Sequence, residues 1–205
     1  MTLPNICVSP DFPIVVSGYT ISSHLGDYYK RASHRLSKSL LKHDLAHIIF
    51  PLKHAGSWAK NCALKQTLIL QVLETMNHPV LWIDIDGEVF KYPSVFENAK
   101  FDMAICSVSG HWLTGTLYFS AKKKSMDFVR LWRQKTKPSE PDEVSLLHLF
   151  RCNNSGLKLQ MLDNTYNSVV HKETNLAKVT IGHYLRPDVA PHRGVKAIPI
   201  KKTTK

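Results

Sequence analysis

The chain has 205 residues, of which 43% are hydrophobic, and it carries a formal net charge of +11. This length suffices for one well-packed domain, and no stretch approaches the roughly 20 apolar residues that a membrane-spanning helix needs. We expect one domain over residues 1–187 and a basic, proline-containing tail over residues 188–205. The positive charge points to an anionic partner, such as a nucleotide, an anionic lipid or glycolipid, or a nucleic acid.

The four cysteines are scattered along the chain and form no Cys-x-x-Cys pair. This spacing favours reduced thiols over a disulfide framework. The first 13 residues also lack the basic-then-apolar pattern of a secretory signal. We therefore expect a cytoplasmic protein, in which the basic tail is the part that would contact a membrane surface.

Strand and helix patterns alternate along the chain. Short apolar or alternating runs predict strands, and apolar residues at every third or fourth position predict helices. In chain order, the expected strands are 12–17, 47–50 (ended by Pro51), 80–83, 103–108, 114–120, 157–161 and 178–181. The expected helices are 23–43, 57–76 (capped by Ser57), 120–135 (capped by Ser120) and 144–150. This alternation predicts an α/β fold with helices on both faces of one sheet.

Asp84 and Asp86 directly follow the apolar run 80–83 and form the most informative pair in the chain. Two carboxylates at the end of a buried strand are costly unless a cation lies between them. A hard divalent ion that shares its oxygen ligands with a phosphate would satisfy both. Thr20 and His183 also follow strand candidates, and ligands of open α/β sheets bind at the carboxyl ends of the strands. We therefore expect these residues at one rim of the sheet, although an ordinary solvated turn remains the alternative.

Several segments, in a fixed order, resemble the GT-A-fold glycosyltransferases, which transfer a sugar from a nucleotide-diphospho-sugar. The segments are 15–20 (the first strand and the turn after it), 57–65 before the acidic pair, the DxD-like Asp84-Ile85-Asp86, the small-Gly-small Thr114-Gly115-Thr116, the acidic Asp142-Glu143, the pair Tyr166-Asn167 and Ile181-Gly182-His183. The resemblance covers about residues 13–187. It implies a single Rossmann-like domain with a mixed, mostly parallel sheet.

The resemblance also implies a set of site residues and a donor, most simply a UDP-sugar. The residues implied in nucleotide-sugar binding are Ser17, Tyr19, Thr20, Lys65, Asp84, Ile85, Asp86, Thr114 and Gly115. A Mn²⁺ or Mg²⁺ ion would be held by Asp84, Asp86 and His183, and the imidazole would favour Mn²⁺. Asp142 and Glu143 are the candidate catalytic carboxylates, either as a base for the acceptor or facing the anomeric carbon. The acceptor would be a glycan or glycolipid, or a nucleic acid.

Other functions remain open. Asp84-Ile85-Asp86-Gly87 also resembles the first motif of haloacid-dehalogenase-type phosphatases, in which Asp84 would be the nucleophile. Against this, Glu88 stands where Thr or Val is usual, and the motif comes after 83 residues. A basic nucleic-acid-binding protein without catalysis rests on the charge alone, because no recognised binding motif is present.

The candidate residues also have purely structural interpretations. Lys65 would be a solvated helix residue, Asp142 a helix cap and His183 an ordinary structural histidine. Gly115 would mark a bulge in a strand. Which interpretation holds depends on whether the fold brings these side chains together.

Overall fold

The computed structural model describes residues 8–21, 27–56, 58–108, 110–137, 142–152 and 156–184. Ser57 and the expected tail over residues 188–205 lie outside these ranges. None of the described helices is both long enough and apolar enough to cross a bilayer.

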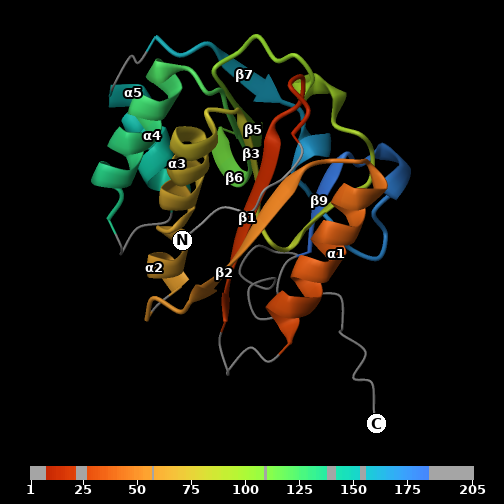
Figure 1. Ribbon diagram of the computed structural model, residues 1–205. Coiled ribbons are helices and arrows are strands. Elements are labelled where there is room, and N and C mark those ends of the chain that lie inside the picture. The colour runs from red at the N-terminus through yellow and green to blue at the C-terminus, as the bar shows by residue number, and fades with distance from the viewer. Residues whose placement is uncertain are drawn as a thin grey trace.

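A six-stranded sheet forms the centre of the fold, with the order β2-β1-β3-β6-β5-β7 (Figure 1). Its strands are β1 (Ile14–Ile21), β2 (His47–Lys53), β3 (Val80–Ile83), β5 (Met103–Val108), β6 (His111–Phe119) and β7 (Leu159–Leu162). Within this sheet β6 runs antiparallel to both of its neighbours, and the other strands run parallel to one another. The expected mixed, mostly parallel sheet is therefore confirmed.

Helices cover both faces of this sheet, as Figure 1 shows with α3, α4 and α5 on one side and α1 on the other. The helices are α1 (Tyr28–Lys42), α2 (Trp58–Cys62), α3 (Lys65–Met76), α4 (Lys123–Lys135) and α5 (Asp142–Cys152). A small second sheet, ordered β4-β9-β8, consists of β4 (Gly87–Val89), β9 (Ile181–His183) and β8 (Ser168–Val169). Three short 3₁₀ turns complete the described elements, at Ser94–Phe96, Asn164–Tyr166 and Leu176–Lys178.

Two hydrophobic cores lie on opposite faces of the central sheet. In β3, Val80 and Trp82 pack with α3, α4 and α5, whereas Leu81 and Ile83 pack with α1 and β9. Successive side chains of a strand point to opposite faces, so an uninterrupted apolar run is what a strand buried on both faces requires. This burial fixes the end of β3, and with it the position of the acidic pair.

Several predicted boundaries were wrong. Strand β2 continues through Pro51 to Lys53, because it is the edge strand beside β1 and Pro51 costs no ladder hydrogen bond on its open side. The helix expected over 57–76 is divided into α2 and α3 by a turn. Ser120 does not cap α4; its hydroxyl bonds with that of Ser125 instead. The last strand is β9, which begins at Ile181 rather than at residue 178.

A buried carboxylate anchors the basic run at the start of α4. Asp102 is 1% exposed and accepts hydrogen bonds from the backbone N–H of Lys158 (2.7 Å) and the ammonium of Lys122 (3.1 Å). Lys124 forms a second ion pair with it at 2.5 Å. Burial alone would raise the pKa of Asp102, but the hydrogen bonds from Lys124, Lys158 and Lys122 outweigh it and hold the pKa below its ordinary value. These lysines therefore stabilise the fold.

We expect Asp102→Asn to lower the free energy of unfolding by about 1–3 kcal/mol at neutral pH, because the buried acceptor loses its charge-assisted bonds. A lowered carboxyl pKa stabilises the folded state above the ordinary pKa of about 3.9 and ceases to do so as pH falls through the folded value. Urea unfolding of both proteins at several pH values should thus show the difference shrinking in acid. Asp127→Asn, at a side chain that is 44% exposed, is the control and should cost less. A constant difference down to the lowest pH would contradict the role of the Asp102 charge.

Candidate active site

A pocket of about 230 Å³ lies where β1, β2 and β3 end. Most of the predicted site residues line it: Tyr19, Thr20, Lys65, Asp84, Ile85, Asp86, Thr114, Gly115, Asp142, Glu143 and His183. Ser17 is the exception, because it is fully buried within β1 and does not line the pocket. The fold therefore gathers residues from six separate segments beside the carboxyl ends of the parallel strands, where α/β sheets bind ligands.

Lys65 lies at the centre of this group. It is 5% exposed, and its ammonium pairs with Asp142 at 2.6 Å and Asp84 at 3.1 Å while donating to the carbonyl oxygen of Thr114 at 2.9 Å. Burial by itself lowers the pKa of Lys65, but the carboxylates of Asp142 and Asp84 outweigh it, and the pKa lies above its ordinary value. The solvated interpretation of Lys65 is thus wrong. The ammonium joins α3, α5, β6 and the end of β3.

Three further contacts hold Asp84 at the end of β3. Its Oδ1 accepts a 2.6 Å hydrogen bond from the indole N–H of Trp82, and its backbone N–H donates to the carbonyl of Gly115 at 2.8 Å. The carbonyl of Asp84 accepts from the N–H of Gly87, which closes the turn. Because side chains two apart on a strand share a face, the sequence could have indicated the contact between Trp82 and Asp84.

Asp86 is paired with His183. The Nδ1 of His183 lies 3.1 Å from Oδ1 of Asp86, and its Nε2 lies 3.1 Å from the hydroxyl of Thr116. An ionised carboxylate only accepts, so Nδ1 carries the proton, and in the neutral imidazole Nε2 keeps its lone pair. The antiparallel pairing of Gly87 in β4 with His183 in β9 produces this contact between residues 97 positions apart.

A second set of contacts fixes the backbone of the acidic turn from the side of α1. The carbonyl of Asp86 accepts from the guanidinium of Arg35 at 3.2 Å and from the backbone N–H of Tyr184 at 3.0 Å. The Arg35 guanidinium also lies 4.1 Å from the centre of the Tyr184 ring, whose hydroxyl donates to Glu88 at 2.8 Å. Burial and the Glu88 carboxylate raise the pKa of Tyr184 to about 12, so this hydroxyl stays protonated as the donor. Sequence patterns gave no signal for this cluster.

Gly115 keeps the floor of the pocket open. A side chain there would place its Cβ 2.6 Å from Oδ1 of Asn167 and 3.2 Å from Nε2 of His183, both too close. The same Asn167 oxygen is buried and has no hydrogen-bond partner among the described residues. The pocket therefore holds an unused amide oxygen, and an imidazole nitrogen bonded to Thr116, beside a space that only glycine leaves free.

Neither a protein-family model nor a curated protein matches the sequence. The structure is similar to a solved glycosyltransferase involved in the glycosylation of the major capsid of PBCV-1, with a TM-score of 0.63 and 14% identity over 83% of this chain and 91% of that chain. It is also similar to the glycosyltransferase GlyE of Streptococcus pneumoniae TIGR4, with a TM-score of 0.55 and 17% identity over 87% of this chain. The alignment covers 55% of the GlyE chain, so this protein spans about half of it.

The chain has a glycosyltransferase fold. The GT-A-like architecture expected from the ordered segments is confirmed. In this glycosyltransferase fold the acidic turn follows β3, and Lys65, Asp142 and Gly115 face it across the pocket.

The potential ligand atoms that line the pocket suit a divalent cation. Asp84 and Asp86 offer hard carboxylate oxygens, and each keeps one oxygen that no described residue hydrogen-bonds. The Nε2 of His183 and the open space beside Gly115 lie next to them, and a metal ion there would replace the Thr116 hydroxyl as the partner of Nε2. As they stand, no three His, Cys, Asp or Glu side chains in the described part of the chain are grouped closely enough to hold a metal ion. Metal binding by Asp84, Asp86 and His183 therefore stays a prediction.

Other lining residues were not among the sequence candidates. Tyr28 and Tyr29 at the start of α1, and Cys62 at the end of α2, line the same pocket. Burial and the nearby Asp142 carboxylate raise the pKa of the Cys62 thiol to about 12, so it is a neutral wall of the pocket. Aromatic and thiol side chains carry no periodic signal that would assign them to a site, and only the fold brings them there.

We expect Lys65→Met to lower the free energy of unfolding by about 3–5 kcal/mol, because a buried carboxylate loses its cation. Asp142, which is 6% exposed, is the carboxylate most affected. Adding Asp142→Asn to Lys65→Met should recover part of the loss, since the uncompensated charge is then removed. Urea unfolding of the two single variants and the double variant measures the coupling. Strictly additive losses would show that the ion pair does not hold this part of the fold.

Proposed function

We propose that this protein is a metal-dependent glycosyltransferase that moves a sugar from a nucleoside-diphosphate sugar to an acceptor. The observation that carries the proposal is the buried ammonium of Lys65 between Asp84 and Asp142, inside a pocket at the carboxyl ends of the strands. An ammonium group and carboxylates that converge on one open space suit a ligand with phosphates and hydroxyl groups. The fold shared with two glycosyltransferases supports the same conclusion.

The charge of the pocket is the reason for a metal ion in this proposal. The described lining residues include four carboxylates (Asp84, Asp86, Asp142 and Glu143) and one ammonium group, a formal charge of −3 when His183 is neutral. A pyrophosphate would be repelled by this excess of negative charge. A divalent cation held by Asp84 and Asp86 would supply the missing positive charge and stabilise the leaving group. The imidazole of His183 favours Mn²⁺ over Mg²⁺ as that ion.

The two candidate catalytic carboxylates are assigned different roles. Asp142 is buried, and its carboxylate is neutralised by the ion pair with Lys65. We therefore assign Asp142 to positioning Lys65 and binding sugar hydroxyl groups. Glu143 is the more accessible of the two and also lines the pocket. We assign Glu143 to the reacting centre, as a base for the acceptor or as the carboxylate that faces the anomeric carbon.

The proposed donor and acceptor follow from the resemblance to GT-A-fold glycosyltransferases. The donor is a UDP-sugar, bound by Tyr19 and Thr20 at the nucleoside and by Lys65 at the phosphates or sugar. The acceptor is a glycan or glycolipid, or a nucleic acid. The location in this proposal is the cytoplasm, which the scattered cysteines without a Cys-x-x-Cys pair support.

A thermal-shift screen tests the donor. Nucleoside diphosphates and nucleotide sugars, each with and without Mn²⁺, are added to the full-length protein. A ligand that binds only the folded state at about 100 times its Kd adds roughly 2.7 kcal/mol. For a chain of this size that raises Tm by roughly 5–10 °C. We expect the shift with UDP compounds and Mn²⁺ together. No shift with any nucleotide would contradict the proposed donor site.

Substitutions in the acidic turn test the metal. We expect Asp84→Asn and Asp86→Asn each to abolish the Mn²⁺-dependent part of nucleotide binding, because each removes a hard, charged ligand. The folded state should survive, since the Asp84 side chain is 39% exposed and Lys65 keeps Asp142 as its partner. Isothermal titration with Mn²⁺ and UDP measures the effect. Asp11→Asn, at an exposed carboxylate outside the pocket, is the matched control. Full Mn²⁺-dependent binding in either pocket variant would refute the metal assignment.

The reaction products separate transfer from phosphate hydrolysis. We expect release of a nucleoside diphosphate from the nucleotide sugar, slowly to water and faster with the correct acceptor. Glu143→Gln should lower the rate of release by at least about 100-fold, while donor binding is retained, if Glu143 acts at the reacting centre. A phosphatase would instead release phosphate from a simple aryl phosphate and form an acyl phosphate on Asp84. That activity, lost in Asp84→Asn, would overturn the proposed function.

A further inference from the structure

The outward face of α1 is basic along its whole length. Four positions at every fourth residue, Lys30, His34, Lys38 and Lys42, are exposed, and Arg31 is exposed beside them. The buried residues of the helix, such as Leu36 and Leu40, lie on the opposite face. The helix contains no acidic residue. Its 15 residues make this basic face roughly 22 Å long at about 1.5 Å per residue.

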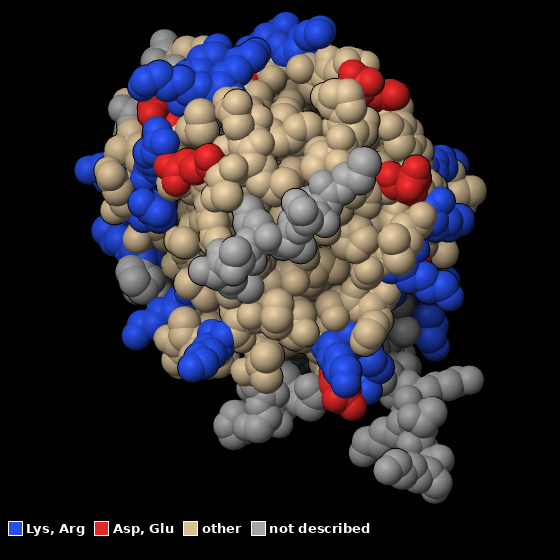
Figure 2. Space-filling model, in the orientation of Figure 1, with Lys and Arg blue, Asp and Glu red and all other residues tan. Residues whose placement is uncertain are grey.

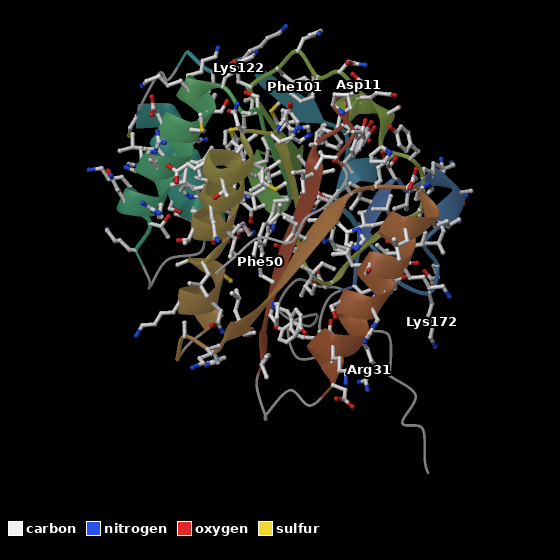
Figure 3. The ribbon with its side chains drawn as sticks, in the orientation of Figure 1. Asp11, Arg31, Phe50, Phe101, Lys122 and Lys172 are labelled. Carbon is white, nitrogen blue, oxygen red and sulfur yellow. The ribbon has the colours of Figure 1, made fainter. Side chains whose placement is uncertain are left out.

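Most of these charges do not stabilise the helix itself, and only Lys42, in the last turn, interacts favourably with the helix dipole. Like charges four residues apart on a helix repel each other, as Lys38 and Lys42 do. Lys30 and Arg31 lie in the first turn, where a positive charge opposes the helix dipole. No ion pair with another described residue relieves these side chains, and Figure 3 shows Arg31 pointing away from the body of the protein. Asp27 and Asp44 flank the helix at its two ends and bond to it through their backbone, but their carboxylates form no ion pair with a described residue of α1.

Several basic residues at the start and middle of α4 are, by contrast, paired within the fold. On α4, Lys123 pairs with Asp127, and Arg130 pairs with Asp127 and Glu74. Lys122 and Lys124 pair with Asp102. Figure 2 shows basic side chains at the foot of α1 and along the edge of the molecule on the side where α1 lies. The α1 face therefore differs from the start of α4, because Lys30, Arg31, Lys38 and Lys42 gather on one helix without an ion pair to a described residue.

An apolar side chain lies among these charges. Leu41 is 68% exposed between Lys38 and Lys42, and it projects from the same side of the helix. Positive charges with one exposed leucine suit a surface that is anionic outside and apolar just beneath. A nucleic acid would use the charges and gain nothing from the leucine, whereas a bilayer accommodates both.

We propose that the outward face of α1 docks the protein on an anionic lipid bilayer. Lysines and arginines would contact the headgroups, and Leu41 would insert at the level of the headgroup boundary. Docking of this kind does not require the chain to be an enzyme. Tyr28 and Tyr29, at the start of the same helix, line the pocket, so docking would place the pocket beside the lipid surface. Only the consequence that the acceptor is displayed at a membrane rests on the proposed function.

Vesicle binding of the full-length chain tests the inference. Vesicles of phosphatidylcholine, with and without phosphatidylglycerol, are sedimented with the protein at low and high salt. Each lysine near an anionic surface contributes about a fivefold factor, so Lys38→Gln/Lys42→Gln should weaken binding roughly 25-fold at low salt. Leu41→Gln should weaken it roughly fivefold, and its effect should persist at high salt because it is not electrostatic. Circular dichroism verifies that each variant is folded.

The matched control is Arg133→Gln/Lys135→Gln, which removes the same number of charges from the exposed end of α4. It leaves α1 and the basic tail unchanged. We expect this control to bind nearly as well as the parent chain. Equal weakening by both double variants would overturn the inference, since net charge alone would then explain the binding. So would an α1 variant that loses affinity for single-stranded RNA, measured by fluorescence anisotropy, but keeps its affinity for vesicles.

Discussion

The ammonium group of Lys65 is the constraint on which the rest of the site depends. A buried charge is tolerated only when its partners are fixed around it, and Lys65 has carboxylates on two elements and a carbonyl on a third. The start of α5, the end of β3 and the middle of β6 must therefore meet at one point. The short turn between α2 and α3 places Lys65 in the first turn of α3, from which its side chain reaches that point.

The small sheet provides the other half of the site by a different means. Pairing of β4 with β9 carries His183 to Asp86, and Arg35 and Tyr184 fix the carbonyl of the same aspartate. The two aspartates of the turn thus have separate supports: Asp84 is held by the side of the sheet that faces α3, and Asp86 by the side that faces α1. A ligand that engages both carboxylates would couple the two halves of the fold. This arrangement suits a phosphate-bound cation that takes one oxygen ligand from each of the two aspartates.

Sequence patterns predicted those features that depend on local chemistry. The apolar runs before Asp84 and in β5, and the alternation in β6, identified these strands. The ordered acidic and glycine-containing segments identified most of the pocket. Features set by distant partners were missed. That Pro51 sits on an open edge, that Ser17 is buried within β1 and that Ser120 bonds with Ser125 instead of capping α4 all depend on neighbours in space. The ion pair of Lys65 with Asp142, 77 positions away, leaves no trace in local periodicity.

Positive and negative charges lie in different parts of the molecule: the pocket is negative, and the outward surface of α1 is positive. This separation limits what each part can bind. The chain carries a net charge of +11, yet the described lining of the pocket is negative. The positive charge therefore does not attract a small phosphate ligand into the pocket by itself, because the carboxylates dominate at short range and distant charges are screened beyond about 10 Å. The metal ion of the proposed function would offset this negative charge for a phosphate ligand. The outward lysines act instead on a partner large enough to span many of them, which is a surface and not a nucleotide.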